Sequence, residues 1–159
     1  METNYWSEIV NKLIEKNYTI ATMESCTGGG IANEITNISG ASAIIRESYI
    51  TYCNKAKIKQ GVSAQIIDKY SVYSTETAVE MAKAVKKQAG SNIGIGVTGQ
   101  LGRIDPNNPV EKLNHVWYAI SNNEGSVFTK EIVVPDEERW KQKKYVINNI
   151  AADLIKLLQ

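Results

Sequence analysis

The chain has 159 residues, of which 43% are hydrophobic and 22% are charged. This length is typical of one domain, and the apolar content excludes an intrinsically disordered chain, because enough surface can be buried to offset the ordering entropy. The formal net charge of +1 disfavours a dedicated nucleic-acid-binding protein, whose binding face is usually strongly basic.

The first half of the chain is predicted to alternate helices and strands. Helices are indicated by apolar residues that recur every three or four positions, and strands by short β-prone runs. The predicted segments are a helix over residues 5–16, a strand over 18–24, a helix containing Ile31, Ile35 and Ile38, a helical turn over 41–46 and a strand over 49–53.

The second half is predicted to contain two more helices, a strand, a hairpin and a closing helix. Ser63 and Ser74 are candidate N-caps, and Gly90 is a helix stop signal. About fifteen residues after Gly99 contain no periodic pattern, and loops of that length are usually functional. The segments are helices over residues 64–70 and 75–89, a strand over 93–99, hairpin strands over 116–120 and 128–134 with a turn over 122–125, and a helix from residue 137.

This order predicts an α/β fold, a three-layer α/β/α sandwich with a mixed, mostly parallel five-stranded sheet. Strands separated by helices favour parallel pairing through right-handed crossovers, and the hairpin adds one antiparallel strand. Residues 1–159 are expected to form a single domain. Ligands gather at the carboxyl ends of parallel strands, so the segments after Glu24, Cys53 and Thr98 are expected to converge.

A glycine-rich run, ESCTGGG over residues 24–30, connects a predicted strand to a predicted helix. Three glycines in a first helical turn cost about 1 kcal/mol each relative to alanine, so they must serve another purpose. They could allow a sharp turn or close packing, or they could expose backbone N–H groups that bind a phosphate or an oxyanion. The run matches neither the GxxxxGK(S/T) phosphate loop nor the GxSxG nucleophile motif.

Ser25 stands at this strand end, where it could be a helix N-cap or a nucleophile. Cys26 is the competing nucleophile, although a small buried side chain is its more common role. A serine nucleophile needs a base, and a lysine with a lowered pKa can serve. Lys57 and its neighbours Lys55 and Lys59 follow the second strand; the alternative is a solvated charged turn.

Three further positions could complete a site at the same edge of the sheet. The hydroxyl of Tyr52 could polarise a carbonyl or relay a proton, or Tyr52 could be an ordinary strand residue. Thr98 and Gly99 could supply a hydroxyl and a backbone N–H. Arg139 lies near the start of the last helix, where the helix dipole disfavours a cation, so it could pair with an anionic ligand or with nearby acidic residues.

Metal sites, disulfides and membrane spans are not expected. Cys26 and Cys53 lack CxxC spacing, and His115 is the only histidine and is predicted to be structural. No apolar run approaches the roughly 18 residues of a membrane span, and residues 1–11 lack a signal-peptide pattern. We therefore expect a cytoplasmic protein without a cofactor.

Taken together, these segments resemble the CinA C-terminal domain family, the competence/damage-inducible protein A domain. The resemblance covers nearly the whole chain in the right order. The family pattern (A/M)ESCTGG matches residues 23–29. TYSNEAK corresponds to residues 51–57, VSxxxxxEMA is similar to residues 73–82 and TGxAGP is similar to residues 98–103.

The resemblance implies an amidohydrolase that deamidates nicotinamide mononucleotide to nicotinate mononucleotide and ammonia without a metal. It implies that Ser25 is the nucleophile, that Lys57 is its general base, and that Tyr52 and Thr98 belong to the catalytic hydrogen-bond network. The substrate-binding residues would be Thr27, Gly28, Gly29, Gly99 and Arg139. The family also implies a three-layer α/β/α fold, a small nucleotide as the partner and a homo-oligomer, most commonly a dimer.

The sequence departs from the family pattern mainly in the loop at residues 102–114. The family's AGPDGG is replaced by Leu-Gly-Arg-Ile-Asp-Pro over residues 101–106, and Lys55 and Lys143 replace a glutamate and an arginine. These departures leave two alternatives open: a nucleotide-binding module that has lost catalysis, or an amidohydrolase for another small amide.

Overall fold

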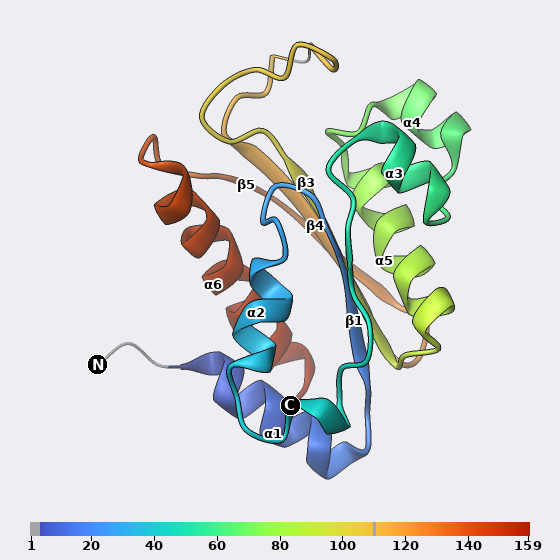
Figure 1. Cartoon of the computed structure of the whole chain (residues 1–159), viewed down its shortest axis with the longest axis vertical. Coiled ribbons are helices and arrows are strands. Elements are labelled where there is room, and N and C mark those ends of the chain that lie inside the picture. Colours follow the sequence, from blue (N-terminus) through green and yellow to red (C-terminus); the bar gives the residue numbers. More distant parts are fainter. Residues whose placement is uncertain (1–3, 110) are drawn as a thin grey trace.

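The computed structural model describes residues 4–109 and 111–159, and it places a twisted five-stranded sheet between two layers of helices (Figure 1). Helices α1, α2 and α6 cover one face, and α3, α4 and α5 lie on the other side of the sheet. This arrangement confirms the predicted three-layer α/β/α fold. The predicted single domain over residues 1–159 includes residues 1–3 and 110, which lie outside the described residues, and it stays a prediction.

The elements follow the predicted order along the chain. They are α1 (Tyr5–Lys16), β1 (Ile20–Glu24), α2 (Gly30–Thr36), the 3₁₀ turn η1 (Ala41–Ala43), β2 (Tyr49–Ile50), α3 (Asn54–Lys59), α4 (Ala64–Tyr70), α5 (Thr75–Ala89), β3 (Ile93–Gly99), β4 (His115–Ser121), β5 (Val127–Val133) and α6 (Arg139–Leu157). Among the described residues, none of the helices combines the length and the apolar character that a membrane crossing requires.

The strand order across the sheet is β2-β1-β3-β4-β5. Strand β1 is parallel to both β2 and β3, whereas β4 is antiparallel to β3 and to β5. The sheet is therefore mixed with β4 as the antiparallel strand, as predicted. The carboxyl ends of β1, β2 and β3 lie at one edge, which is where the predicted site residues should meet.

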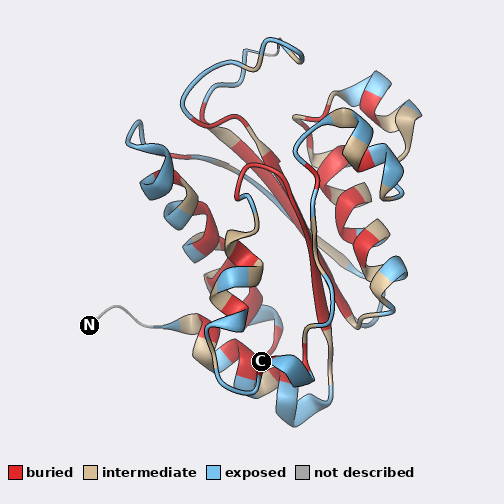
Figure 2. Ribbon diagram, in the orientation of Figure 1, coloured by how far each residue is buried: buried red, intermediate tan, exposed pale blue. Residues whose placement is uncertain are grey.

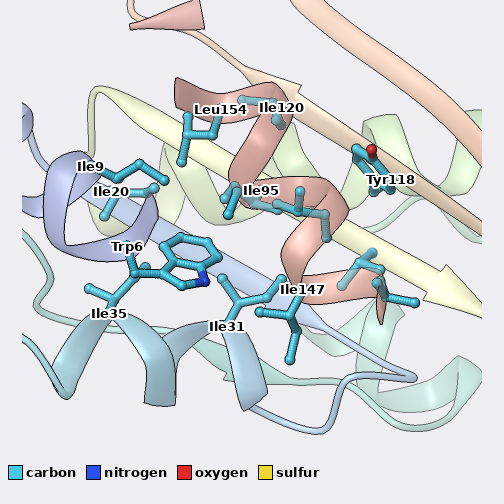
Figure 3. Close-up of a cluster of buried hydrophobic side chains, with 14 of the residues drawn as sticks. Trp6, Ile9, Ile20, Ile31, Ile35, Ile95, Tyr118, Ile120, Ile147 and Leu154 are labelled. Carbon is cyan, nitrogen blue, oxygen red and sulfur yellow. The ribbon is translucent and has the colours of Figure 1, made fainter. Parts of the chain in front are cut away.

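Burial agrees with the positions of the strands in the sheet. All five residues of β1 and six of the seven residues of β3 are buried, whereas every residue of β5, at the sheet edge, is at least partly exposed (Figure 2). On one face of the sheet, buried side chains from α1, α2 and α6 interlock, among them Trp6, Ile31 and Ile147 (Figure 3). A smaller apolar cluster on the other face includes Met23 and Met81.

The structure corrects the predictions around β2. The strand predicted over residues 49–53 is only Tyr49–Ile50, because its partner β1 ends at Glu24, opposite Ile50. Helix α3 begins at Asn54, and three residues separate it from β2, so the three lysines that could have formed a solvated turn belong to a helix. The neighbouring predictions were also slightly long, since β1 begins at Ile20 and α2 ends at Thr36.

Two glycines let α5 lie directly on β3. A methyl group added at Gly96 would lie 2.4 Å from the Ala78 carbonyl oxygen and 2.5 Å from the Ala82 nitrogen, and Gly94 faces the next turn of α5 in the same way. Both obstructing groups are backbone atoms of a helix, so a side chain there could be accommodated only by moving α5 away from the sheet.

We therefore expect Gly96→Ala to lower the free energy of unfolding by about 3 kcal/mol, since overpacking against backbone relaxes poorly. Urea denaturation would measure this change. Gly125→Ala is the matched control: no atom lies within 4 Å of the added carbon, so only the strain of a left-handed residue remains, about 1 kcal/mol. Equal losses in the two variants would contradict close packing of α5 on β3.

Candidate functional site

A cleft of about 560 Å³ opens at the carboxyl ends of the central strands. Its walls come from segments that are far apart in the sequence: the turn after β1, residues 52–55 around the start of α3, residues 99–108 after β3, and the first residue of α6. The predicted convergence of the segments after Glu24, Cys53 and Thr98 is thus observed.

Ser25 lines this cleft, and the buried Lys57, which is not itself a lining residue, contacts its hydroxyl. The Lys57 Nζ lies 3.2 Å from the Ser25 Oγ and 2.8 Å from the backbone oxygen of Thr51. Lys57 is only 2% exposed, and this desolvation lowers its pKa from 10.5 to about 8. The lysine is therefore neutral in about a tenth of the molecules at pH 7 and in about half at pH 8, and a neutral amine can accept the serine proton.

Backbone hydrogen bonds place the two groups. The Ser25 N–H donates to the Val97 oxygen (3.1 Å), which holds the start of the turn against β3. The Thr51 N–H donates to the Glu24 oxygen (2.9 Å), which ties the segment before α3 to the end of β1. The Thr51 carbonyl in turn accepts from Lys57, so one residue connects the strand that precedes the serine to the lysine.

The glycine-rich run is organised by the carboxylate of Glu24, which is fully buried. It accepts hydrogen bonds from the backbone N–H groups of Ile31 (2.8 Å) and Ala32 (3.0 Å) in the first turn of α2, and from the hydroxyls of Thr27 (2.6 Å) and Thr22 (3.0 Å). The helix N-terminus therefore binds a carboxylate of the protein itself. This role of Glu24 was not predicted from the sequence.

This arrangement changes the roles expected of Thr27, Gly28 and Gly29. The Thr27 hydroxyl donates a hydrogen bond to the Glu24 carboxylate, and the Gly28 N–H donates to the backbone oxygen of Ser25 (2.9 Å). Both glycines have positive φ angles, 59° and 93°, which supports the sharp-turn interpretation. Among the described residues, the cleft lining includes none of these three; it includes Gly99.

Of the remaining predicted residues, two line the cleft and one does not. The Arg139 Nη2 donates to the Tyr52 hydroxyl (2.8 Å), and both residues border the cleft. The Tyr52 side chain is 58% exposed, so it is not a core strand residue. Thr98 is fully buried, and its hydroxyl donates to the Val72 oxygen (2.8 Å), which ties β3 to the segment between α4 and α5.

Cys26 and His115 take the structural roles that were considered for them. Burial raises the pKa of the Cys26 thiol to about 12, so this residue is not a thiolate near neutral pH. His115 lies in β4, where its Nδ1 contacts the Glu131 carboxylate at 2.8 Å. The described residues contain no group of three or more histidine, cysteine or acidic side chains that could hold a metal ion.

The loop after β3 carries a carboxylate that the sequence analysis did not single out. Asp105 accepts from the Tyr73 hydroxyl (2.7 Å), the Asn108 amide (3.0 Å) and the Asn107 N–H (2.9 Å). Asn108 also exchanges two hydrogen bonds with Asn54, of 3.0 and 3.1 Å. The loop is thereby fastened to the first residue of α3, one turn before Lys57.

Comparison with known families identifies one match over nearly the whole chain. The model of the CinA C-terminal domain matches residues 2–158. A competence-damage inducible protein of Clostridium novyi is 42% identical over 138 residues, which are 85% of this chain and 33% of that protein. A competence-damage inducible protein of Clostridium botulinum is 44% identical over 102 residues, 64% of this chain and 25% of the relative. The chain thus spans a third or less of these relatives.

Solved structures share the fold. The structure of a CinA superfamily protein from Escherichia coli superposes with a TM-score of 0.88 at 25% identity, covering 99% of this chain and 92% of the other. A competence/damage inducible protein from Agrobacterium tumefaciens gives a TM-score of 0.85 at 26% identity, covering 100% and 99%.

The burial of Lys57 makes a testable contribution to stability. Its folded pKa of about 8 lies below the usual lysine pKa of 10.5, so between these values the unfolded chain binds more protons than the folded one. Stability linked to Lys57 therefore rises with pH over this range. We expect wild type to gain about 2 kcal/mol relative to Lys57→Met between pH 7 and pH 10, measured by urea denaturation.

Lys55→Met is the matched control, because Lys55 is exposed in the same helix. The difference in stability between wild type and this variant should hardly change between pH 7 and pH 10. A pH-independent difference for Lys57→Met would show that the pKa of Lys57 is not lowered in the folded protein.

Proposed function

The chain belongs to the CinA C-terminal domain family, and from this premise we propose that it is an amidohydrolase that converts nicotinamide mononucleotide and water into nicotinate mononucleotide and ammonia. The observation that carries the proposal is the contact of 3.2 Å between Ser25 Oγ and the buried Lys57 Nζ. A serine paired with a desolvated amine is a known arrangement for acyl transfer.

In the proposed mechanism, neutral Lys57 accepts the proton of Ser25 as the Oγ attacks the carboxamide carbon. The Thr51 carbonyl holds the Nζ during this step, and the protonated lysine then donates its proton to the leaving nitrogen. The C–N bond breaks, ammonia departs and an acyl ester remains on Ser25. A water molecule, deprotonated by Lys57, hydrolyses this ester to release the carboxylate product.

The tetrahedral intermediate needs donors for its oxyanion. Among the glycines considered for this role, the Gly28 N–H already donates to the backbone oxygen of Ser25, whereas Gly99 lines the cleft. We therefore assign the oxyanion to the backbone N–H of Gly99. One such donor contributes about 3–4 kcal/mol to transition-state stabilisation.

The charges around the cleft support a phosphorylated substrate. Lys55, Arg103 and Arg139 border it from three different segments, and arginine in particular binds phosphate through parallel hydrogen bonds. Tyr52 fixes one of these cations by accepting from Arg139. The homodimer and the cytoplasmic location suggested by the resemblance stay predictions.

We expect Ser25→Ala and Lys57→Met each to lower ammonia release from nicotinamide mononucleotide by about a thousandfold or more, because each removes one half of the nucleophile–base pair. A coupled ammonia assay with purified protein measures this. Cys26→Ala is the control, since it removes the neighbouring thiol, and it should keep most of the activity. Wild-type turnover in Ser25→Ala would eliminate that residue as nucleophile.

The same assay separates the two alternatives. Tight nucleotide binding in a calorimetric titration, without ammonia release over hours, would identify a binding module that has lost catalysis. Faster release of ammonia from a different small amide would identify another substrate for the same dyad.

The pH dependence follows from the pKa of Lys57. Only the neutral amine can accept the serine proton, so kcat/KM should rise with pH along a curve whose midpoint lies at about 8. Between pH 6 and pH 8 the neutral fraction, and with it kcat/KM, increases about fiftyfold. Thermal unfolding at each pH excludes a change in folded fraction, and a flat profile over this range would be incompatible with Lys57 as the base.

A further inference from the structure

Asp105 is the one carboxylate among the described residues that line the cleft, and it faces a site otherwise rich in cations. None of Lys55, Arg103 and Arg139 forms an ion pair with a carboxylate within the described part of the chain. The cleft therefore presents positive and negative charges that do not neutralise each other.

Neutral donors hold Asp105 in place. Its Oδ2 accepts from the Tyr73 hydroxyl at 2.7 Å and from the Asn108 amide at 3.0 Å, and its Oδ1 accepts from the Asn107 N–H at 2.9 Å. These bonds fix the orientation of the carboxylate without cancelling its charge. They also keep it ionised, because the hydrogen bond from Asn108, followed by those from Tyr73 and Asn107, lowers the pKa of Asp105.

Asp105 lines the same cleft as Ser25. Its charge acts on Lys57, raising the lysine pKa against the larger effect of desolvation, and Lys57 contacts the Ser25 Oγ. A ligand that occupies the cleft and presents its carboxamide to Ser25 therefore also borders Asp105.

We propose that Asp105 forms a subsite for a positively charged heteroaromatic ring, so that the cleft selects an N-substituted pyridinium carboxamide over the same nucleotide with a neutral ring. The inference rests on the proposed deamidation, which it makes more specific. A pyridinium mononucleotide carries a cation on its ring and an anion on its phosphate. The cleft offers the complementary pair, with Asp105 for the ring and the three unpaired cations for the phosphate.

A purely structural role for Asp105 is the alternative. Its three hydrogen bonds organise the loop, so its loss could simply loosen the wall of the cleft. Loosening would weaken every ligand to a similar degree, whereas loss of a charge would weaken the cationic ring alone. The two roles therefore differ in a ratio between substrates rather than in the absolute rate.

The test compares nicotinamide mononucleotide with its reduced 1,4-dihydro form, which keeps the carboxamide, ribose and phosphate but has a neutral ring. We expect Asp105→Asn to lower the kcat/KM ratio of oxidised to reduced nucleotide about tenfold relative to wild type. The different intrinsic reactivity of the two amides, and any change in the pKa of Lys57, cancel when the ratios of variant and wild type are compared.

Asn54→Ala is the matched control, because it breaks the amide pair with Asn108 and loosens the loop without changing its charge. It should lower kcat/KM for both nucleotides together and leave the ratio unchanged. If Asp105→Asn does not fold, Asp105→Ser also removes the charge while keeping an acceptor for Tyr73. An unchanged ratio in the folded charge variant would overturn the proposal.

Binding measurements keep this inference separate from the proposed function. In the Ser25→Ala background, calorimetric titration gives Kd for both nucleotides without turnover, and Asp105→Asn should weaken binding of the oxidised form selectively. If wild type released no ammonia but showed this selectivity, the proposed deamidation would fail and the cationic subsite would stand. If wild type released ammonia but its preference for the oxidised nucleotide did not depend on Asp105, the proposed deamidation would stand and the cationic subsite would fail.

Discussion

The site depends on the burial of one amine. Lys57 is removed from water almost completely. The shift of its pKa from 10.5 to about 8, in which desolvation outweighs the opposing nearby charges, corresponds to a net disadvantage of about 3 kcal/mol for the charged form. The fold tolerates this because the Thr51 carbonyl accepts one hydrogen bond from the Nζ and the Ser25 hydroxyl is a second partner. Thr51 is itself bonded to the end of β1, so the serine and the lysine share one anchor.

A second buried charge explains the glycine-rich turn. The Glu24 carboxylate sits at the end of β1 and binds the N-terminus of α2, so the chain must reverse within a few residues to bring that helix back over the strand. Gly28 and Gly29 supply the positive φ angles of this reversal. The turn thereby presents Ser25 at its start, while the helix dipole is used to stabilise an internal carboxylate rather than a ligand.

Much of this could be predicted from the sequence, for identifiable reasons. The apolar spacing of the helices and the alternation of helices with strands were sufficient for the layers and for the mixed sheet, and the motif resemblance led to Ser25 and Lys57. Three features were missed. The length of β2 depends on where its partner strand ends. Whether the N-terminus of α2 binds a ligand anion or a side chain of the protein depends on the position of the Glu24 carboxylate. Asp105 lies in a loop that has no periodic pattern. Each is decided by a tertiary contact that leaves no local pattern.

The altered loop is better understood from its charges than from its departure from the family pattern. Asp105 could have been neutralised by an arginine of the same cleft, but tyrosine and asparagine side chains hold it instead. Neutral donors orient a carboxylate without cancelling its field, and within the described part of the chain Arg103 and Arg139 form no ion pair with a carboxylate. A loop that had merely lost its function would have no need to keep opposite charges apart inside one cleft. The substitutions at residues 101–106 are therefore compatible with a site that is specialised for a ligand carrying both charges.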